Sequence, residues 1–267
     1  MTLAEALLDL QDLTRRLRRE CPWDREQTAR TIAPHTVEEA YEVADAVHAD
    51  DDAKLRDELG DLLFQVYFLS LLLEEKGAGD LEQVARGAHE KLVRRHPHVF
   101  GDGDARTAGR VRERWEEIKS EQEGREGTFH DVPESLPALT YARKTGRRAA
   151  TVGFDYPGAE DVFAELADEI AELRSAVAEA GEIVPEGEAD PPVFDEVGDV
   201  LYATVNLARH LNVDPELALR ATVRRFVERV EHAERLAAAD GLSFAELTLA
   251  EQDGYFDRAK SSEEAAR

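Results

Sequence analysis

The sequence has 267 residues, which fits one large domain or two small ones, and its apolar fraction of 42% is enough for a sizeable core. The 58 acidic residues outnumber the 33 basic ones, and the net charge of −25 argues against a nucleic-acid partner or an anionic membrane surface. A single cysteine excludes an intramolecular disulfide, and no apolar run reaches the ~18 residues of a membrane span. Because no signal peptide is visible, we expect a soluble, cytoplasmic protein.

Helical periodicity runs through most of the chain and strand patterns are nearly absent, so we expect an all-α fold. Residues 37–47 form an amphipathic pattern, and residues 55–73 become apolar all round, as in the central, buried helix of a bundle. Asp161 and Asp214 are predicted N-caps, the latter followed by Pro215 at the first helical position. Further helices are predicted over 162–178, 194–211 and 215–239.

Glycine and proline mark the predicted breaks between helices. Helices are expected to end at 77–80 and 101–103, and His96-Pro97-His98 predicts a turn. The segment 121–137 mixes glycine, proline and charged residues and predicts a linker. The segment 181–192 predicts a non-helical loop.

An internal repeat organises the chain, because four features occur twice in the same order at offsets of 130 to 141 residues. The acidic pairs are Glu39–Glu42 and Glu58–Asp61 in the first copy, and Glu169–Glu172 and Glu196–Asp199 in the second. The basic and aromatic members are Lys91, Arg95, Trp115 and Lys119, matched by Arg225, Arg229, Phe256 and Lys260. We therefore predict two tandem helical-bundle repeats, over 1–120 and 138–260, joined by the linker and followed by a tail at 261–267.

The paired acids are candidate metal ligands. Each pair lies at positions i and i+3, on one face of a helix, so two such helices packed antiparallel bring four carboxylates together. Oxygen ligands in that number suit Mg²⁺ or Mn²⁺. The pairs Glu58–Asp61 and Glu196–Asp199 are each followed by an apolar segment, so we expect these acids to be partly buried. A cation would offset the repulsion between their negative charges. Any single pair in so acidic a chain is also explained by a solvated helix face, but two matched sets favour a metal site.

The recurring basic and aromatic residues are candidates for nucleotide binding. Lys91 and Arg95 lie at i and i+4, an arrangement that clamps phosphate oxygens or forms a salt bridge to a neighbouring helix. Trp115 and Phe256 stand four residues before a lysine, where they stack on a base or fill the core. The sequence has no Walker A loop, GxGxxG or GxSxG motif, so any phosphate binding depends on a metal and on side chains.

Five segments add a more specific signal: CPWDREQT (21–28), TVEEAYEVADA (36–46), DELGDLLFQV (57–66), KLVRRHPHVFGD (91–102) and AATVGFDYP (149–157). They closely resemble the MazG family of nucleoside triphosphate pyrophosphohydrolases, and the resemblance covers nearly the whole chain in order. The resemblance implies an all-α fold of two tandem repeats and a homodimer. It also implies Mg²⁺-dependent hydrolysis of NTPs and dNTPs to monophosphate and pyrophosphate, with broad base tolerance and a house-cleaning role in the nucleotide pool.

Carried over by position, the resemblance assigns the metal to Glu39, Glu42, Glu58 and Asp61, and to Glu169, Glu172, Glu196 and Asp199. It assigns phosphate and nucleotide contacts to the recurring basic and aromatic residues named above. The second repeat departs from the family pattern with Arg225 for Lys, Phe256 for Trp and Val223 for Asn, and with a longer connection between its acidic pairs. As in two-repeat family members, we expect the second repeat to be the main catalytic unit.

The predicted reaction is attack of water on the α-phosphorus with pyrophosphate as the leaving group, whose charge lysine or arginine offsets. Glu38 and Asp168, each next to a predicted ligand, are the nearest spare carboxylates for a general base. Two alternatives stay open at this point. One is a non-catalytic all-α interaction protein with solvated acidic faces, and the other is a dNTP pyrophosphatase of narrow specificity.

Overall fold

The computed structural model describes residues 1–101, 107, 111, 127–130, 132–181 and 190–266, with side chains up to Glu263. Within these ranges the chain folds into helices and contains no β-strand, which confirms the predicted all-α class. The chain divides into two compact units, Met1–Arg125 and Glu126–Arg267, and the division falls within the predicted linker. No helix in the described ranges is long and apolar enough to cross a membrane.

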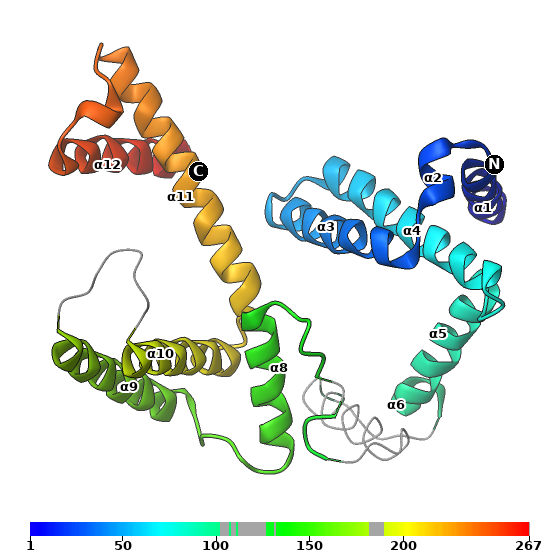
Figure 1. Cartoon of the computed structure of the whole chain (residues 1–267), viewed down its shortest axis with the longest axis horizontal. Coiled ribbons are helices and arrows are strands. Elements are labelled where there is room, and N and C mark those ends of the chain that lie inside the picture. Colours follow the sequence, from blue (N-terminus) through cyan, green and yellow to red (C-terminus); the bar gives the residue numbers. More distant parts are fainter. Residues whose placement is uncertain (102–106, 108–110, 112–126, 131, 182–189, 267) are drawn as a thin grey trace. The chain divides into compact units, whose positions relative to one another are not determined.

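The first unit is built around two long antiparallel helices (Figure 1). Its elements are α1 (Leu3–Glu20), α2 (Pro22–Glu26), α3 (Ala29–His48), α4 (Asp52–Glu75), α5 (Leu81–Arg95) and α6 (Pro97–Phe100). Ile32 of α3 packs with Phe68 and Leu72 of α4 in a small buried core. Helix α3 begins earlier than the apolar pattern indicates and continues through Pro34, with Thr28 as its capping residue.

Ion pairs fasten α1 to the end of α4. Arg15 lies 2.6 Å from Glu74, and Arg18 lies 2.8 Å from Glu75. Arg18 also donates to the backbone oxygens of Asp24 and Gln27, so one side chain ties α1, α4 and the α2 segment together. The hydrogen bond from Arg18 lowers the pKa of the Glu75 carboxyl.

The second unit repeats the pair of long antiparallel helices and adds a helical arm (Figure 1). Its elements are α8 (Ala138–Thr151), α9 (Ala159–Ala180), α10 (Pro191–His210), α11 (Pro215–Ala239), the 3₁₀ turn η1 (Phe244–Glu246) and α12 (Leu249–Ala266). Helices α8 and α9 both pack against α10, and α12 packs against α11.

Two predicted features of helix starts need correction. Asp214 caps α11 as expected and accepts a hydrogen bond from the Leu217 amide at 3.1 Å. Asp161 is not an N-cap, because α9 begins at Ala159; as a carboxylate in the first turn it still complements the helix dipole. Helix α10 begins at Pro191 rather than at 194, since two consecutive prolines fit the first helical turn, where backbone N–H groups have no intrahelical partner.

A polar cluster fixes the loop between α8 and α9 to the C-terminal end of α10. Asp155 accepts a hydrogen bond from Arg209 at 2.9 Å and lies 3.1 Å from His210 Nε2, while Asn206 accepts from Arg209 Nε at 2.9 Å. Helix α8 packs close to this cluster, since a Cβ placed at Gly146 would be in van der Waals contact with Arg209 Nε at 3.4 Å. Burial would raise the pKa of Asp155, but the hydrogen bonds from Arg209 and His210 outweigh it and hold that pKa below its ordinary value.

The expectation that 55–73 is buried all round is wrong for the single chain. Helix α4 does bury Phe68 and Leu72 and contacts α1, α3 and α5, but Leu59, Leu63 and Val66 remain exposed. A similar apolar face is exposed in the second unit, where Phe194 and Leu201 of α10 are 70% and 54% accessible. In each unit, the contact between the two long helices therefore buries only part of their apolar side chains, and the rest remain exposed.

Candidate active site

The first site is assembled by the short turn between α3 and α4. Asp50 adopts a left-handed backbone conformation with φ of 53°, which aspartate tolerates better than most residues, and Asp51 caps α4 through the amides of Ala53 and Lys54. The chain therefore reverses within three residues, and the two helices run side by side.

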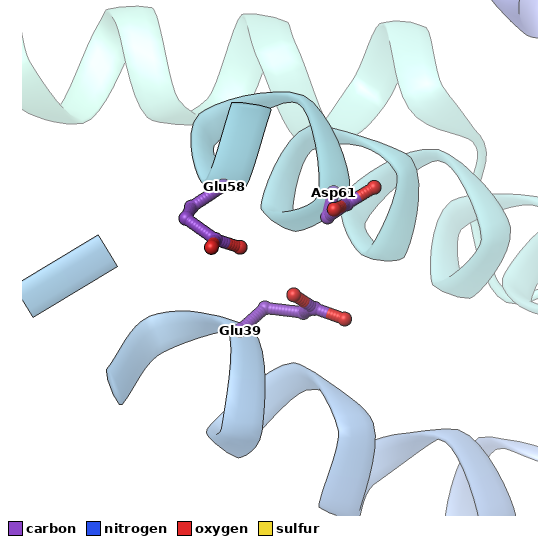
Figure 2. A group of neighbouring side chains, drawn as sticks. All are labelled: Glu39, Glu58 and Asp61. Atoms are coloured by element: carbon purple, nitrogen blue, oxygen red, sulfur yellow. The ribbon is translucent and has the colours of Figure 1, made fainter. Parts of the chain in front are cut away.

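Three predicted ligands of the first repeat come together across this hairpin. Figure 2 shows Glu39 of α3 facing Glu58 and Asp61 of α4. One carboxylate oxygen from each of the three lies within 4.8 Å of the others. Glu58 is buried, Glu39 is half-buried and Asp61 is exposed, so the expected partial burial holds for the two glutamates. The cluster is therefore open to solvent on the Asp61 side.

The electrostatics of this cluster disfavour three negative charges without a cation. Burial raises the pKa of Glu39, and the neighbouring Asp61 and Glu42 raise it further. Burial also raises the pKa of Glu58, and a hydrogen bond with Glu42 raises it further. The Lys54 ammonium, 3.8 Å away, lowers the same pKa by a smaller amount. The fourth predicted ligand, Glu42, thus lies beside the cluster as the partner of Glu58.

The second site has the same construction on α9 and α10. Oxygen atoms of Glu169, Glu196 and Asp199 lie within 4.8 Å of one another. Burial raises the pKa of Glu169, with Asp199 and Glu172 adding to it, and burial followed by Glu172 raises the pKa of Glu196. The Oε2 atom of Glu196 is buried and has no hydrogen-bond partner.

These observations fit a divalent cation. The donors are all carboxylate oxygens, which suit a hard cation, and a buried oxygen without a partner carries a desolvation penalty that coordination would offset. In each site, two helices together supply three carboxylate oxygens. Glu42 lies next to the first cluster and Glu172 next to the second. The residues present can therefore hold the predicted Mg²⁺ or Mn²⁺.

The candidate general bases lie at the edges of these clusters. Glu38 is exposed on α3, 3.5 Å from His35, and its charge contributes to the raised pKa of Glu39. Asp168 is exposed on α9, one residue before Glu169. Both positions are open to solvent, so both carboxylates have access to water.

The predicted basic residues lie on other helices. Lys91 is exposed and Arg95 half-buried on α5, while Lys260 is exposed on α12. On α11, Arg225 donates to Thr222 at 3.0 Å. Trp115 and Lys119 lie outside the described residues.

Arg229 forms its ion pair with Glu263 rather than with the carboxylate cluster, and Phe256 contacts the ring of Phe226. Among the described side chains, the structure thus gathers the acids of each repeat, and it separately gathers the second repeat's arginines and phenylalanine on the α11–α12 pair.

Each carboxylate cluster has a further polar neighbour that the sequence motifs did not indicate. His35 contacts Trp23 with a ring separation of 5.9 Å, and its charge acts on Glu39. At the matching position in the second repeat, Glu165 acts on Glu169 and hydrogen bonds to Tyr156. Burial, then that hydrogen bond, raises the pKa of Tyr156 to about 12. A spacing of four residues before a ligand was the signal that could have identified His35 and Glu165.

Comparisons with known proteins agree with this geometry. A family model described as the MazG nucleotide pyrophosphohydrolase domain matches residues 27–100, which contain the whole first acidic set. A nucleoside triphosphate pyrophosphohydrolase of Escherichia coli K12 is 40% identical over 270 residues, covering 98% of this chain and 99% of the relative. The chain belongs to the MazG family of nucleoside triphosphate pyrophosphohydrolases.

A second MazG relative, a nucleoside triphosphate pyrophosphohydrolase/pyrophosphatase of Thermotoga maritima, is 39% identical over 247 residues, covering 91% of each chain. A crystal structure of a mazG-related protein from the same organism matches 42% of this chain and 96% of that chain, at 28% identity and a TM-score of 0.37. The family resemblance identified from the sequence motifs is confirmed, as is the enzyme class, a hydrolase acting on acid anhydrides.

Proposed function

We propose that this MazG protein hydrolyses nucleoside triphosphates to the monophosphate and pyrophosphate with Mg²⁺ bound at the carboxylate cluster of each repeat. The observation that carries the proposal is the assembly of the same Glu, Glu and Asp set twice, each within 4.8 Å and each from two antiparallel helices. We take the two units as tandem copies of one catalytic bundle. Mn²⁺ is an alternative ion, since the same oxygen ligands suit it.

The division of roles follows from charge. The carboxylates would hold Mg²⁺, which supplies Lewis-acid polarisation of phosphate oxygens when bound. Arg225 and Arg229 in the second repeat, and Lys91 and Arg95 in the first, bind phosphate oxygens and offset the negative charge of the leaving pyrophosphate. Lys119 and Lys260 add to that charge, and Trp115 and Phe256 contact the nucleotide. Glu38 and Asp168 accept the proton of the attacking water.

A homodimer is part of the proposal. Exposed apolar side chains occur on both long helices of the second unit and on α11; they include Phe163, Phe194, Leu201, Val223 and Phe226, each at least 47% accessible. Burying such a surface against a second copy stabilises the assembly through the hydrophobic effect. Light scattering after size exclusion at micromolar protein should give the mass of a dimer, and a monomer would contradict this part.

Broad base tolerance is the expected specificity, because the proposed contacts are made mainly to phosphates. An enzyme of this kind acts on the cytoplasmic nucleotide pool and removes unwanted triphosphates from it. The test is a product assay across the eight common NTPs and dNTPs with Mg²⁺. Monophosphate and pyrophosphate from most of them support the proposal. Turnover of a single dNTP would favour the narrow alternative instead.

A further inference from the structure

Two helix faces meet where α11 and α12 pack together. On α11, Thr222, Arg225, Phe226 and Arg229 recur at i, i+3, i+4 and i+7, which places them along one face. On α12, Phe256, Lys260 and Glu263 recur at i, i+4 and i+7, with the same consequence. All four of the second repeat's proposed nucleotide-binding residues are therefore on these two faces, and Glu263 is the acidic residue among them.

Two contacts join these faces. The rings of Phe226 and Phe256 are 5.9 Å apart, and Arg229 Nε donates to Glu263 Oε2 at 2.8 Å. The two charged side chains are only 23% and 29% exposed, so their geometry is more restricted than that of a free surface pair. Because Glu263 engages Nε, the two terminal nitrogens of the guanidinium stay available within the described part of the chain.

We infer that Glu263 is a positioning residue for the second site: it holds the Arg229 guanidinium so that its terminal nitrogens meet a phosphate oxygen of the bound triphosphate. The inference rests on the proposed phosphate-binding role of Arg229. An arginine with several rotatable bonds loses less freedom on binding when a partner already fixes its orientation, so pre-orientation appears as tighter nucleotide binding. The first repeat has Gln122 at the corresponding offset in the sequence, so the acidic residue at this position occurs in the second repeat alone.

A second ion pair between α11 and α12 serves as a control that tests whether the Arg229–Glu263 pair has only a structural role. Arg258 of α12 donates to Asp240 at the end of α11 at 2.9 Å, also joining α11 to α12. Asp240→Asn removes that ion pair at the far end of α11, 11 residues beyond Arg229, and changes none of the residues proposed to bind nucleotide. If the Arg229–Glu263 pair only fastens the two helices, Asp240→Asn and Glu263→Gln should act alike on nucleotide binding.

The experiment measures second-site affinity directly. In a protein whose first site carries Glu42→Gln and Glu58→Gln, calorimetry gives the Kd for α,β-methylene-ATP with Mg²⁺ well below the melting temperature. Glu263→Ala should raise Kd about three- to tenfold, with a smaller rise for Glu263→Gln, which keeps an acceptor for Nε. Asp240→Asn should leave Kd unchanged, and Arg229→Ala should raise it most. Circular dichroism confirms that every variant is folded.

Each other outcome overturns a stated part of the account. If Arg229→Ala weakens binding and Glu263→Ala does not, the positioning role is wrong and the phosphate role of Arg229 stands. If Glu263→Ala tightens binding, Glu263 competes with phosphate and the inference is reversed. If Arg229→Ala has no effect, or the parent protein does not bind, the proposed role of Arg229 fails together with the inference.

Discussion

The carboxylates of Glu169 on α9 and Glu196 on α10 approach within 4.8 Å of each other, and one oxygen of Glu196 is buried without a hydrogen-bond partner. Burial raises the pKa of both carboxyls, and the neighbouring acids Asp199 and Glu172 raise both further. Oxygens of Glu39 and Glu58 in the first unit also lie within 4.8 Å, and burial raises the pKa of both. Each unit thus holds several carboxylates close together at a cost in free energy, which binding of a cation would reduce.

Replacing Glu196 by glutamine should separate metal binding from folding. Glu196→Gln keeps the shape of the side chain but removes one charge from the cluster. In EDTA we expect an unchanged or higher melting temperature, since repulsion falls. The rise in melting temperature on adding Mg²⁺ should shrink, because a ligand is lost. Thermal melts with and without Mg²⁺ measure both effects.

The control for that experiment is Glu179→Gln, which removes the same charge from an exposed position of α9. Its Mg²⁺-induced shift should match that of the unaltered protein. If Glu196→Gln lowers stability in EDTA and leaves hydrolysis unaffected, the acids are structural partners and the site is wrongly placed.

The clusters also predict the pH dependence of metal-free stability. The folded-state pKa values of Glu58 and Glu196 are raised above their ordinary 4.5, so ionising them costs stability at a pH above the folded values. That cost falls as the pH drops through the folded pKa values and vanishes below the ordinary 4.5, where the folded and unfolded chains both hold the protons. In EDTA, the double variant Glu58→Gln with Glu196→Gln should be the more stable protein at pH 7, with the difference closing toward pH 4.5.

Chemical denaturation at a series of pH values measures that difference. A gap between the two proteins that widens on acidification would mean that the glutamates are stabilised as anions, which contradicts the sign of both shifts. Excess Mg²⁺ at pH 7 should reverse the order of stability, since only the unaltered protein keeps its full ligand set.

Much of the fold follows from local pattern. The antiparallel acidic helices could be predicted because apolar residues recur at helical spacing. Asp214 could be predicted as an N-cap because a proline follows it. The start of α9 was misplaced by three residues, because acidic residues serve equally in a cap and in a first turn. The exposed face of α4 could not be predicted, because periodicity reports which residues are apolar and not whether the same chain covers them.

The candidate site was partly readable for a similar reason. Spacing at i and i+3 placed Glu58 and Asp61 on one face, and the repeat signalled their importance. The partner of Arg229 was not readable, since Glu263 is 34 residues away in sequence and lies within a segment interpreted as a tail. Long-range ion pairs depend on how helices cross, which no local pattern fixes.

The polar cluster around Asp155 should contribute to the stability of the second unit. Asp155→Asn removes the charge that Arg209 and His210 share, and we expect a loss of about 1–3 kcal/mol in the free energy of unfolding at pH 7. Because the folded pKa of Asp155 is lowered, its contribution is present above its ordinary pKa of 3.8 and disappears as pH falls through the folded value. Urea titrations at pH 7 and pH 3 measure the loss.

Asp253→Asn on the exposed side of α12 is the matched control and should change the free energy of unfolding little. Equal effects of the two substitutions at pH 7 would show that the hydrogen bonds of Asp155 add nothing to stability.

The two repeats should contribute unequally to turnover. We expect Glu172→Gln with Glu196→Gln to lower total hydrolysis more than Glu42→Gln with Glu58→Gln. The second repeat has a longer connection between its acidic pairs, suited to covering a pocket. Phe256 offers less stacking surface than Trp115, so we expect the second site to accept a wider range of bases at weaker affinity. Comparison of kcat/KM for ATP and dTTP on both double variants tests the order. Near-complete loss in the first-repeat variant alone would reverse it.

The most direct test of the central claim follows the products of ATP hydrolysis in one set of reactions. The protein is incubated with ATP in Mg²⁺ or in EDTA, beside a variant that carries Glu58→Gln and Glu196→Gln, and nucleotides and pyrophosphate are resolved by chromatography. The account predicts equal amounts of AMP and pyrophosphate with Mg²⁺, none in EDTA, and at least a hundredfold loss of rate in the variant, on the order of 3 kcal/mol of transition-state stabilisation. ADP with inorganic phosphate, or unchanged turnover by the variant, would contradict it.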